Sequence, residues 1–236
     1  MATYVLIHGA GSDSWYWHRV RPELERRGHD VVAPDLPCDD DSAGLLEYRD
    51  TVLDAIGNRR ELVVVAQSMG AFTAPLLCDH VPVDLLVLVA AMVPSPGESP
   101  GAWWTNTGHE RAKREQDERD GRPTDGDFDP VVTFLHDVPS AVAAESAVHV
   151  RAQSGTPFAT PWPLPAWPNV PTRFLLCTND RLFPADFQRR VVRERLGIVP
   201  DEIESGHLPA LSQPAELAER LESYRIERAS TANRRR

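Results

Sequence analysis

The sequence predicts an α/β protein with a mostly parallel sheet and helices on both of its faces. Strand-like apolar runs alternate with helix-like segments, several runs are apolar at every position, and they end at turn-forming residues. A strand that is buried on both faces of a parallel sheet has such a continuous run. Alternating strands and helices are joined by right-handed crossovers, which place helices on both faces. At 236 residues we expect one domain over residues 1–236.

The expected strands lie at the apolar runs, and the turn residues that close the runs give their ends. They cover residues 4–8, 30–33, 61–67, 85–92 and 172–178, with a weaker pattern at 198–204. The expected helices have apolar residues spaced three to four apart. They cover residues 15–27, 45–56, 70–77, 184–196 and 209–226, with Gly28 as the end of the first and Ser42 as the cap of the second.

Residues 94–171 interrupt this alternation, and we expect them to form a lid or cap above the sheet. The charged run His109–Asp129 predicts a solvated helix followed by an acidic turn. Large apolar side chains above a sheet edge can line a pocket, or they can form a small core of the insertion itself. The candidates for substrate binding are Trp103, Trp104, Phe128, Phe134, His136 and Trp162. The polar tail at 228–236 is expected to be frayed.

Composition and charge exclude several classes of protein. Hydrophobic residues make up 42% of the chain, as in globular proteins, and the net charge of −10 opposes binding to nucleic acid. The longest apolar run, 85–94, is far shorter than the roughly 20 residues of a membrane-spanning helix, and no secretory signal is visible. Three cysteines without a C-x-x-C pair indicate free thiols in a reducing compartment. We therefore expect a cytoplasmic protein that has no metal site. A monomer or a homodimer is expected, and the sequence does not decide between them.

The segment Ala66–Gly70 has the pattern of a nucleophile elbow. It lies between an expected buried strand and an expected helix, with Ser68 at its centre. A sharp strand-to-helix turn crowds the residues two positions before and after the centre, and alanine and glycine fit there. The usual pattern is G-x-S-x-G, and alanine replaces the first glycine here. We expect the Ser68 hydroxyl to project above the sheet edge as a nucleophile.

A serine hydroxyl needs a base, and His207 is the best-placed histidine in the sequence. It lies in a short loop between the last expected strand and the last expected helix. Asp180 follows the strand at 172–178 and supplies a carboxylate to orient the imidazole, with Glu98 as the less favoured alternative. The chain order Ser68, Asp180, His207 is one of the orders known for a catalytic triad.

Acyl transfer also needs N–H donors for the negative oxygen that develops on the substrate. The backbone N–H of Met69 follows the nucleophile at the start of a helix, where backbone amides and the helix dipole favour negative charge. The turn His8–Ala10 after the first strand offers a second donor, the N–H of Ala10. Loss of one such donor typically lowers the rate by about 10²–10³.

Together these segments resemble the α/β-hydrolase superfamily over nearly the whole chain. The segments that carry the resemblance are 8–11, 34–37, 66–70, 179–188 and 206–214, together with Trp15. The parts at 180–188 and 205–214 are most similar to the small branch that includes plant methyl esterases, hydroxynitrile lyases and bacterial relatives. The resemblance implies an α/β-hydrolase fold with a cap insertion, and a serine esterase for small-molecule esters that uses no metal or organic cofactor. The residues it implies as catalytic are Ser68, Asp180 and His207, with Ala10 and Met69 in the oxyanion hole.

Two other functions stay open. The hydroxynitrile lyases of this branch carry a lysine directly after the catalytic histidine, whereas Leu208 follows His207 here and Lys113 is the only lysine. This difference favours hydrolysis over lyase or other non-hydrolytic chemistry on the same triad. Some relatives act as receptors for small molecules, so the third possibility is a binding protein with a slow or vestigial triad.

Overall fold

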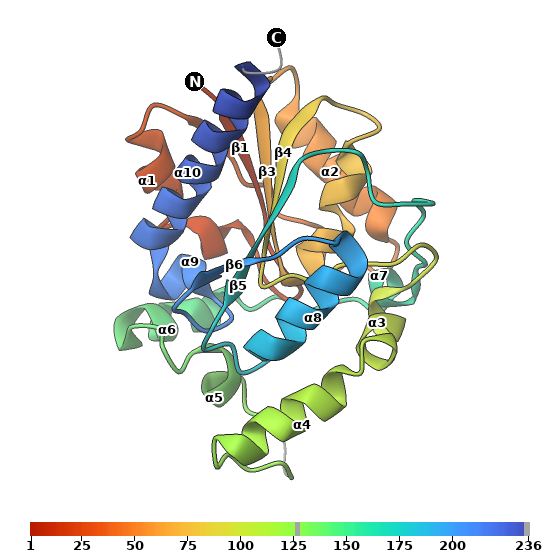
Figure 1. Ribbon diagram of the computed structural model, residues 1–236, viewed down its shortest axis with the longest axis vertical. Helices are drawn as coiled ribbons and strands as arrows, with labels where there is room; N and C mark the ends of the chain where they lie inside the picture. The colour runs from red at the N-terminus through yellow and green to blue at the C-terminus, as the bar shows by residue number, and fades with distance from the viewer. Residues whose placement is uncertain (126–127, 234–236) are drawn as a thin grey trace.

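A computed structural model describes residues 1–125 and 128–233 of the chain. Within these residues six strands form one sheet, in the order β2-β1-β3-β4-β5-β6 (Figure 1). They are β1 (Thr3–Ile7), β2 (Asp30–Val32), β3 (Leu62–Gln67), β4 (Val83–Val89), β5 (Thr172–Cys177) and β6 (Asp201–Ile203). All neighbouring pairs run parallel. The predicted α/β class and parallel sheet are therefore confirmed, and each strand overlaps an expected run.

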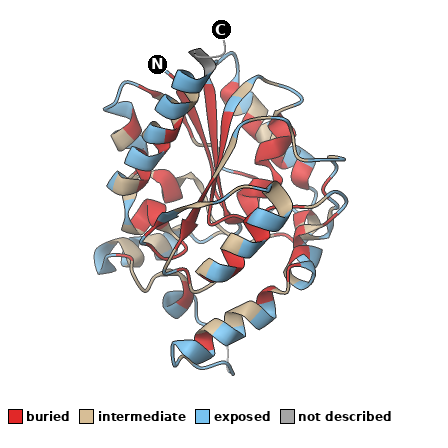
Figure 2. Ribbon diagram, viewed as in Figure 1, coloured by how far each residue is buried: buried red, intermediate tan, exposed pale blue. Residues whose placement is uncertain are grey.

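Helices cover both faces of this sheet (Figure 1). On one face lie α1 (Arg21–Glu25) and α10 (Pro214–Asn233), and on the other lie α2 (Leu45–Ile56) and α8 (Ala185–Leu196). Every residue of β1 and β3 is buried, and Figure 2 shows the strands as the buried centre of the molecule. Successive side chains of a strand point to opposite faces. This is why the central strands are apolar at nearly every position.

Between β4 and β5 the chain forms a series of short helices. They are α3 (Pro100–Asn106), α4 (His109–Arg119), α5 (Pro130–Phe134), α6 (Ser140–Ser146), the 3-10 helix η4 (Ala147–His149) and α7 (Thr156–Ala159). Helices α4, α5 and α6 lie beyond the carboxyl ends of the strands (Figure 1). We call residues 94–171 the cap. Helix α4 occupies the first part of the charged run, and residues 126–127 of that run lie outside the described residues.

Two expected helices are interrupted by proline. The segment 15–27 is divided into the 3-10 helix η1 (Ser14–Trp17) and α1, which has Pro22 at its start. The segment that begins at Ser68 forms two 3-10 helices, η2 (Ser68–Phe72) and η3 (Ala74–Leu77), and the second has Pro75 in its first turn. Proline has no N–H to donate to the preceding turn, so a regular α-helix is not continued through it.

Two predictions about helix ends were wrong. Gly44, and not Ser42, caps α2: its N–H donates to the Glu47 carboxylate at 2.8 Å, while the Ser42 hydroxyl donates to Asp40. The last expected helix divides into α9 (Pro209–Ser212) and α10, and α10 continues to Asn233, beyond the expected end at 226. Residues 234–236 lie outside the described part. No helix in the described ranges is long and apolar enough to cross a membrane.

Candidate active site

Ser68 lies at the turn from β3 into η2 and has a strained backbone. Its φ of +52° is in the left-handed region, which residues other than glycine rarely adopt. Gly70 is required close by, because a Cβ there would lie 2.8 Å from the backbone oxygen of His8. A Cβ on Gly9 would lie 3.0 Å from the Cβ of Ser68. The serine is thus held on a tight bend between two stretches of backbone that leave no room for larger residues.

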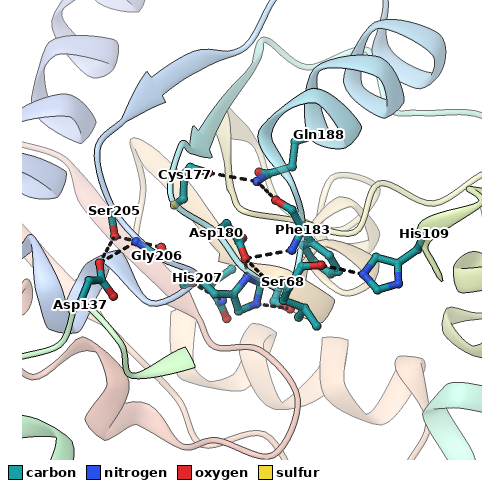
Figure 3. Close-up of polar contacts among 12 residues, drawn as sticks. Ser68, His109, Asp137, Cys177, Asp180, Phe183, Gln188, Ser205, Gly206 and His207 are labelled. Carbon is teal, nitrogen blue, oxygen red and sulfur yellow. Dashed lines mark hydrogen bonds and ion pairs between the residues drawn. The ribbon is translucent and has the colours of Figure 1, made fainter. Parts of the chain in front are cut away.

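The structure brings Ser68, His207 and Asp180 into one hydrogen-bonded chain (Figure 3). Nε2 of His207 lies 3.1 Å from Oγ of Ser68, and Nδ1 of His207 lies 2.7 Å from Oδ2 of Asp180. All three residues are buried, and their loops follow β3, β5 and β6. Because the carboxyl ends of parallel strands meet at one edge of the sheet, residues far apart in the chain converge here.

Asp180 is held by its own loop, which fixes the direction of its second oxygen. Oδ1 accepts hydrogen bonds from the backbone N–H groups of Leu182 at 2.8 Å and Phe183 at 2.9 Å. Oδ2 is left to accept from Nδ1 of His207. An ionised carboxylate only accepts, so the imidazole proton belongs on Nδ1. Nε2 is then free to accept the proton of the Ser68 hydroxyl.

Glu98, the alternative acid, lies in a different ion pair. The Arg195 guanidinium forms two hydrogen bonds with its carboxylate, one of them 3.0 Å long from Nη2 to Oε1. Burial alone would raise the pKa of Glu98, but the hydrogen bonds from Arg195 and Asn106 outweigh it and hold the pKa below its usual value. Glu98 therefore links the cap to α8, and its carboxylate binds Arg195 instead of His207.

The two residues expected to donate to an oxyanion, Ala10 and Met69, line the same cavity as Ser68. Neither backbone N–H donates a hydrogen bond to another group in the described residues. His8 shapes the turn that carries Ala10. Its Nε2 accepts from the N–H of Leu36 at 3.1 Å, so Nδ1 carries the proton and donates to the Gly9 oxygen at 2.8 Å. Burial lowers the pKa of His8, which favours this neutral form.

A cavity of about 640 Å³ opens at Ser68 beneath the cap. Of the six candidates for substrate binding, Trp104, Phe128 and Phe134 line it. The other three do not, which corrects the expectation for them. Trp103 and Trp162 are fully buried in the core, where their indole N–H groups donate to backbone oxygens. His136 instead lies against Gly206, in the loop before His207.

Several residues of the site were missed in the sequence. Gln67 precedes the nucleophile, and its Nε2 donates to the backbone oxygen of His207 at 3.1 Å. His109 of α4 lines the cavity and bonds through Nε2 to the Leu182 oxygen at 2.7 Å. Burial lowers the pKa of His109. Gln67 directly precedes Ser68 in the elbow motif, so its position in the sequence could have indicated that it belongs to the site. The residues next to His109 in the sequence form no motif that indicates a role in the site.

Other residues that line the cavity come from both the sheet side and the cap. They include Trp15, Tyr16, Lys113, His149, Arg151, Leu208 and Leu211. Within the described residues, no group of three His, Cys, Asp or Glu side chains is placed to hold a metal ion. The described part of the site thus consists of one hydroxyl, one imidazole, one carboxylate and two backbone N–H groups that donate to no other described group, beside a largely apolar cavity.

Comparison with known proteins gives the family of the chain. The model of the alpha/beta hydrolase family matches residues 4–220. The chain belongs to this family. Norfluorocurarine synthase 1 from Strychnos sp is 23% identical over 93% of both chains, and methylesterase 3 from Arabidopsis thaliana is 25% identical over 90% of this chain and 92% of that one. The solved structure of a pyrethroid hydrolase from Sphingobium faniae JZ-2 has a TM-score of 0.76 and 23% identity, with 97% of this chain and 99% of that chain covered.

Proposed function

We propose that this member of the alpha/beta hydrolase family is a serine hydrolase that cleaves a small carboxylic ester. The observation that carries the proposal is the continuous hydrogen-bonded chain from Ser68 through His207 to Asp180, which opens onto the cavity. Similar proteins are named methylesterase and pyrethroid hydrolase, which supports ester chemistry. Acyl transfer on such a triad needs no metal and no organic cofactor.

The reaction follows from the directions of the hydrogen bonds. Oγ of Ser68 attacks the ester carbonyl carbon while Nε2 of His207 takes its proton, and the Asp180 carboxylate stabilises the imidazolium that forms. The N–H groups of Ala10 and Met69 stabilise the negative oxygen. The imidazolium then returns the proton to the departing alcohol. Water attacks the acyl-enzyme with the same imidazole as base, which releases the acid and restores the serine.

We propose a hydrophobic or aromatic ester as the substrate. Trp104, Phe128 and Phe134 line the cavity and offer apolar surface and ring faces. A cavity of about 640 Å³ is in the range that encloses a small organic molecule. This small-molecule ester is the partner that we propose, and nucleic acid is excluded from the proposal by the charge of −10.

Lyase chemistry is the second candidate, because Lys113 lines the same cavity. Leu208, the residue directly after His207, also lines it and is apolar. Lys113 is part of α4 in the cap, whereas the loop that carries His207 contributes an apolar side chain to the cavity. Cleavage of a cyanohydrin would support the lyase candidate, and tight binding of an ester without turnover would support a binding protein.

The deciding experiment is a panel of small esters, lactones and cyanohydrins, assayed with the wild type and with Ser68→Ala. We expect turnover of p-nitrophenyl acetate by the wild type, its loss in Ser68→Ala, and labelling of Ser68 by a fluorophosphonate. Ser42→Ala, at an exposed position bonded to Asp40, is the matched control and should keep full activity. A Ser68→Ala protein with wild-type turnover would remove Ser68 as the nucleophile.

We further propose that the chain acts as one domain in the cytoplasm, as a monomer or homodimer. Cys38, Cys78 and Cys177 are all unpaired in the structure, which fits a reducing compartment. Helices on both faces of the sheet and two large apolar clusters fit a single domain. Sedimentation analysis of the full chain would measure the number of subunits.

A further inference from the structure

The loop that carries His207 is held by the cap as well as by the sheet. Asp137 lies between α5 and α6, and its Oδ2 accepts a hydrogen bond of 2.6 Å from the backbone N–H of Gly206 (Figure 3). The hydroxyl of Ser205 donates to the same oxygen at 3.4 Å. Gly206 directly precedes His207. A cap carboxylate is therefore bonded to the main chain one residue away from the proposed base.

The fit of this contact is tight. A Cβ on Gly206 would lie 2.6 Å from Oδ1 of Asp137 and 2.8 Å from Nε2 of His136, so the loop backbone lies directly against both side chains. Oδ1 of Asp137 and Nε2 of His136 are buried and have no hydrogen-bond partner in the described residues. A partly buried carboxylate is costly unless it is hydrogen-bonded. The bond to Gly206 is the shortest contact that offsets this cost.

Two further contacts fix the same loop from other directions. Nε2 of Gln67 donates to the backbone oxygen of His207 at 3.1 Å, and the N–H of Asn179, the residue before Asp180, donates to the oxygen of Ser205 at 3.0 Å. The backbone is thus held on both sides of the imidazole: Asp137 and Asn179 hold the residues before it, and Gln67 holds the histidine itself.

We infer that Asp137 is a positioning residue, which sets the loop so that the imidazole of His207 reaches both Ser68 and Asp180. This inference rests on the proposed hydrolase function. The two ring nitrogens of His207 form hydrogen bonds of 3.1 Å to Ser68 and 2.7 Å to Asp180. A shift of the His207 backbone moves the ring and therefore lengthens at least one of these bonds. Misplacement of a reacting group by about 1 Å can lower the rate by about 10²-fold.

The test compares Asp137→Ala with Asp137→Asn. We expect Asp137→Ala to lower kcat for p-nitrophenyl acetate by about 10–100-fold with little change in KM, because the imidazole and not the cavity is displaced. Asp137→Asn should recover most of kcat, since its amide oxygen still accepts from the Gly206 N–H. Asp129→Ala is the matched control. Asp129 caps α5 through the N–H of Val131 at 2.8 Å, and among the described residues its side chain makes no hydrogen bond to the loop, so kcat should stay within about threefold.

A second measurement does not depend on turnover. The proton on Nδ1 of His207 should give a downfield NMR signal in the wild type and in Asp137→Asn, and this signal should broaden or shift in Asp137→Ala. An unchanged signal in Asp137→Ala, or an equal loss of kcat in Asp129→Ala, would overturn the inference. If the wild type hydrolyses no ester but the signal responds as expected, the positioning role stands and the proposed function fails. Thermal unfolding by circular dichroism shows that each variant is folded.

Discussion

Replacement of Asp180 by asparagine separates the two tasks of its carboxylate. Oδ1 accepts from the N–H groups of Leu182 and Phe183, and an asparagine oxygen can keep both bonds. The amide nitrogen must then face Nδ1 of His207. That amide nitrogen donates a hydrogen bond, so Nδ1 has to accept it, the ring proton moves to Nε2, and Nε2 can no longer take the proton of the Ser68 hydroxyl. The perturbation therefore changes the tautomer and leaves the loop in place.

The expected magnitudes differ for activity and stability. The wrong tautomer lowers kcat by about 10⁴ in a Ser-His-Asp triad on another fold, which at about 1.4 kcal/mol per tenfold corresponds to about 5 kcal/mol of transition-state stabilisation. Asp180→Asn should change the free energy of unfolding by no more than about 1.5 kcal/mol, since both backbone bonds remain. Asp180→Ala leaves two N–H groups without an acceptor, at about 1–3 kcal/mol each, and should cost about 2–6 kcal/mol of stability.

Two measurements are made on Asp180→Asn and Asp180→Ala: the turnover of p-nitrophenyl acetate, and the free energy of unfolding in urea. Asp186→Asn on α8 serves as the matched control, because the Asp186 side chain is 70% exposed and, among the described residues, forms ion pairs with the surface arginines Arg189 and Arg119. It should keep wild-type kcat and stability. If Asp180→Asn turned over substrate at the wild-type rate, Asp180 would not orient the base. If Asp180→Ala were as stable as the wild type, its two backbone bonds would not hold the loop.

Three further predictions test the surroundings of the site. Gly70→Ala places a methyl group 2.8 Å from the backbone oxygen of His8, so it should lower the free energy of unfolding by about 1–3 kcal/mol and also reduce ester turnover. A variant with the melting temperature and turnover of the wild type would contradict the close contact between Gly70 and the His8 backbone. Gln67→Met leaves the buried oxygen of His207 without its donor and should cost about 1–3 kcal/mol in urea unfolding, so an unchanged midpoint speaks against this bond. Because the pKa of Glu98 is held low beside Arg195, its ionised form stabilises the fold above the ordinary pKa, and this stability is lost as the pH falls through the lowered pKa. Glu98→Gln should thus be less stable than the wild type at neutral pH, and urea unfolding at about pH 3 should show a smaller difference.

The catalytic candidates were visible in the sequence because each is marked locally. Ser68 and Asp180 each follow an apolar run that ends at a turn, and His207 lies between the last such run and a helix. These residues can meet although they are far apart in the sequence, because the carboxyl ends of parallel strands lie at one edge of the sheet. The conformation of Ser68, with φ of +52°, likewise follows from the small residues around it.

The lining of the cavity could not be predicted in the same way. Trp103 and Trp104 are neighbours on α3, yet the first is fully buried in the core and the second lines the cavity. Adjacent residues on a helix point about 100° apart, so their environments depend on how α3 is rotated against α8 and the sheet. Nothing in the local sequence fixes that rotation. Asp137 lies between α5 and α6, and no local pattern in the sequence places this part of the cap against Gly206, its partner 69 residues away.

The position of the single lysine bears directly on the choice between hydrolysis and lyase chemistry. Lys113 does line the cavity, but its ammonium is bound at 2.6 Å to the buried carboxylate of Asp117 on the same helix. The side chain next to the base is that of Leu208, which is apolar. A group that departs beside His207 therefore has the imidazolium as its proton donor, and this is the acid that an ester alcohol needs in order to leave. Lyase chemistry that needs a second cation next to the base would have to draw Lys113 away from Asp117, at the cost of a carboxylate left with fewer partners. The arrangement of charge around the base thus favours acyl transfer.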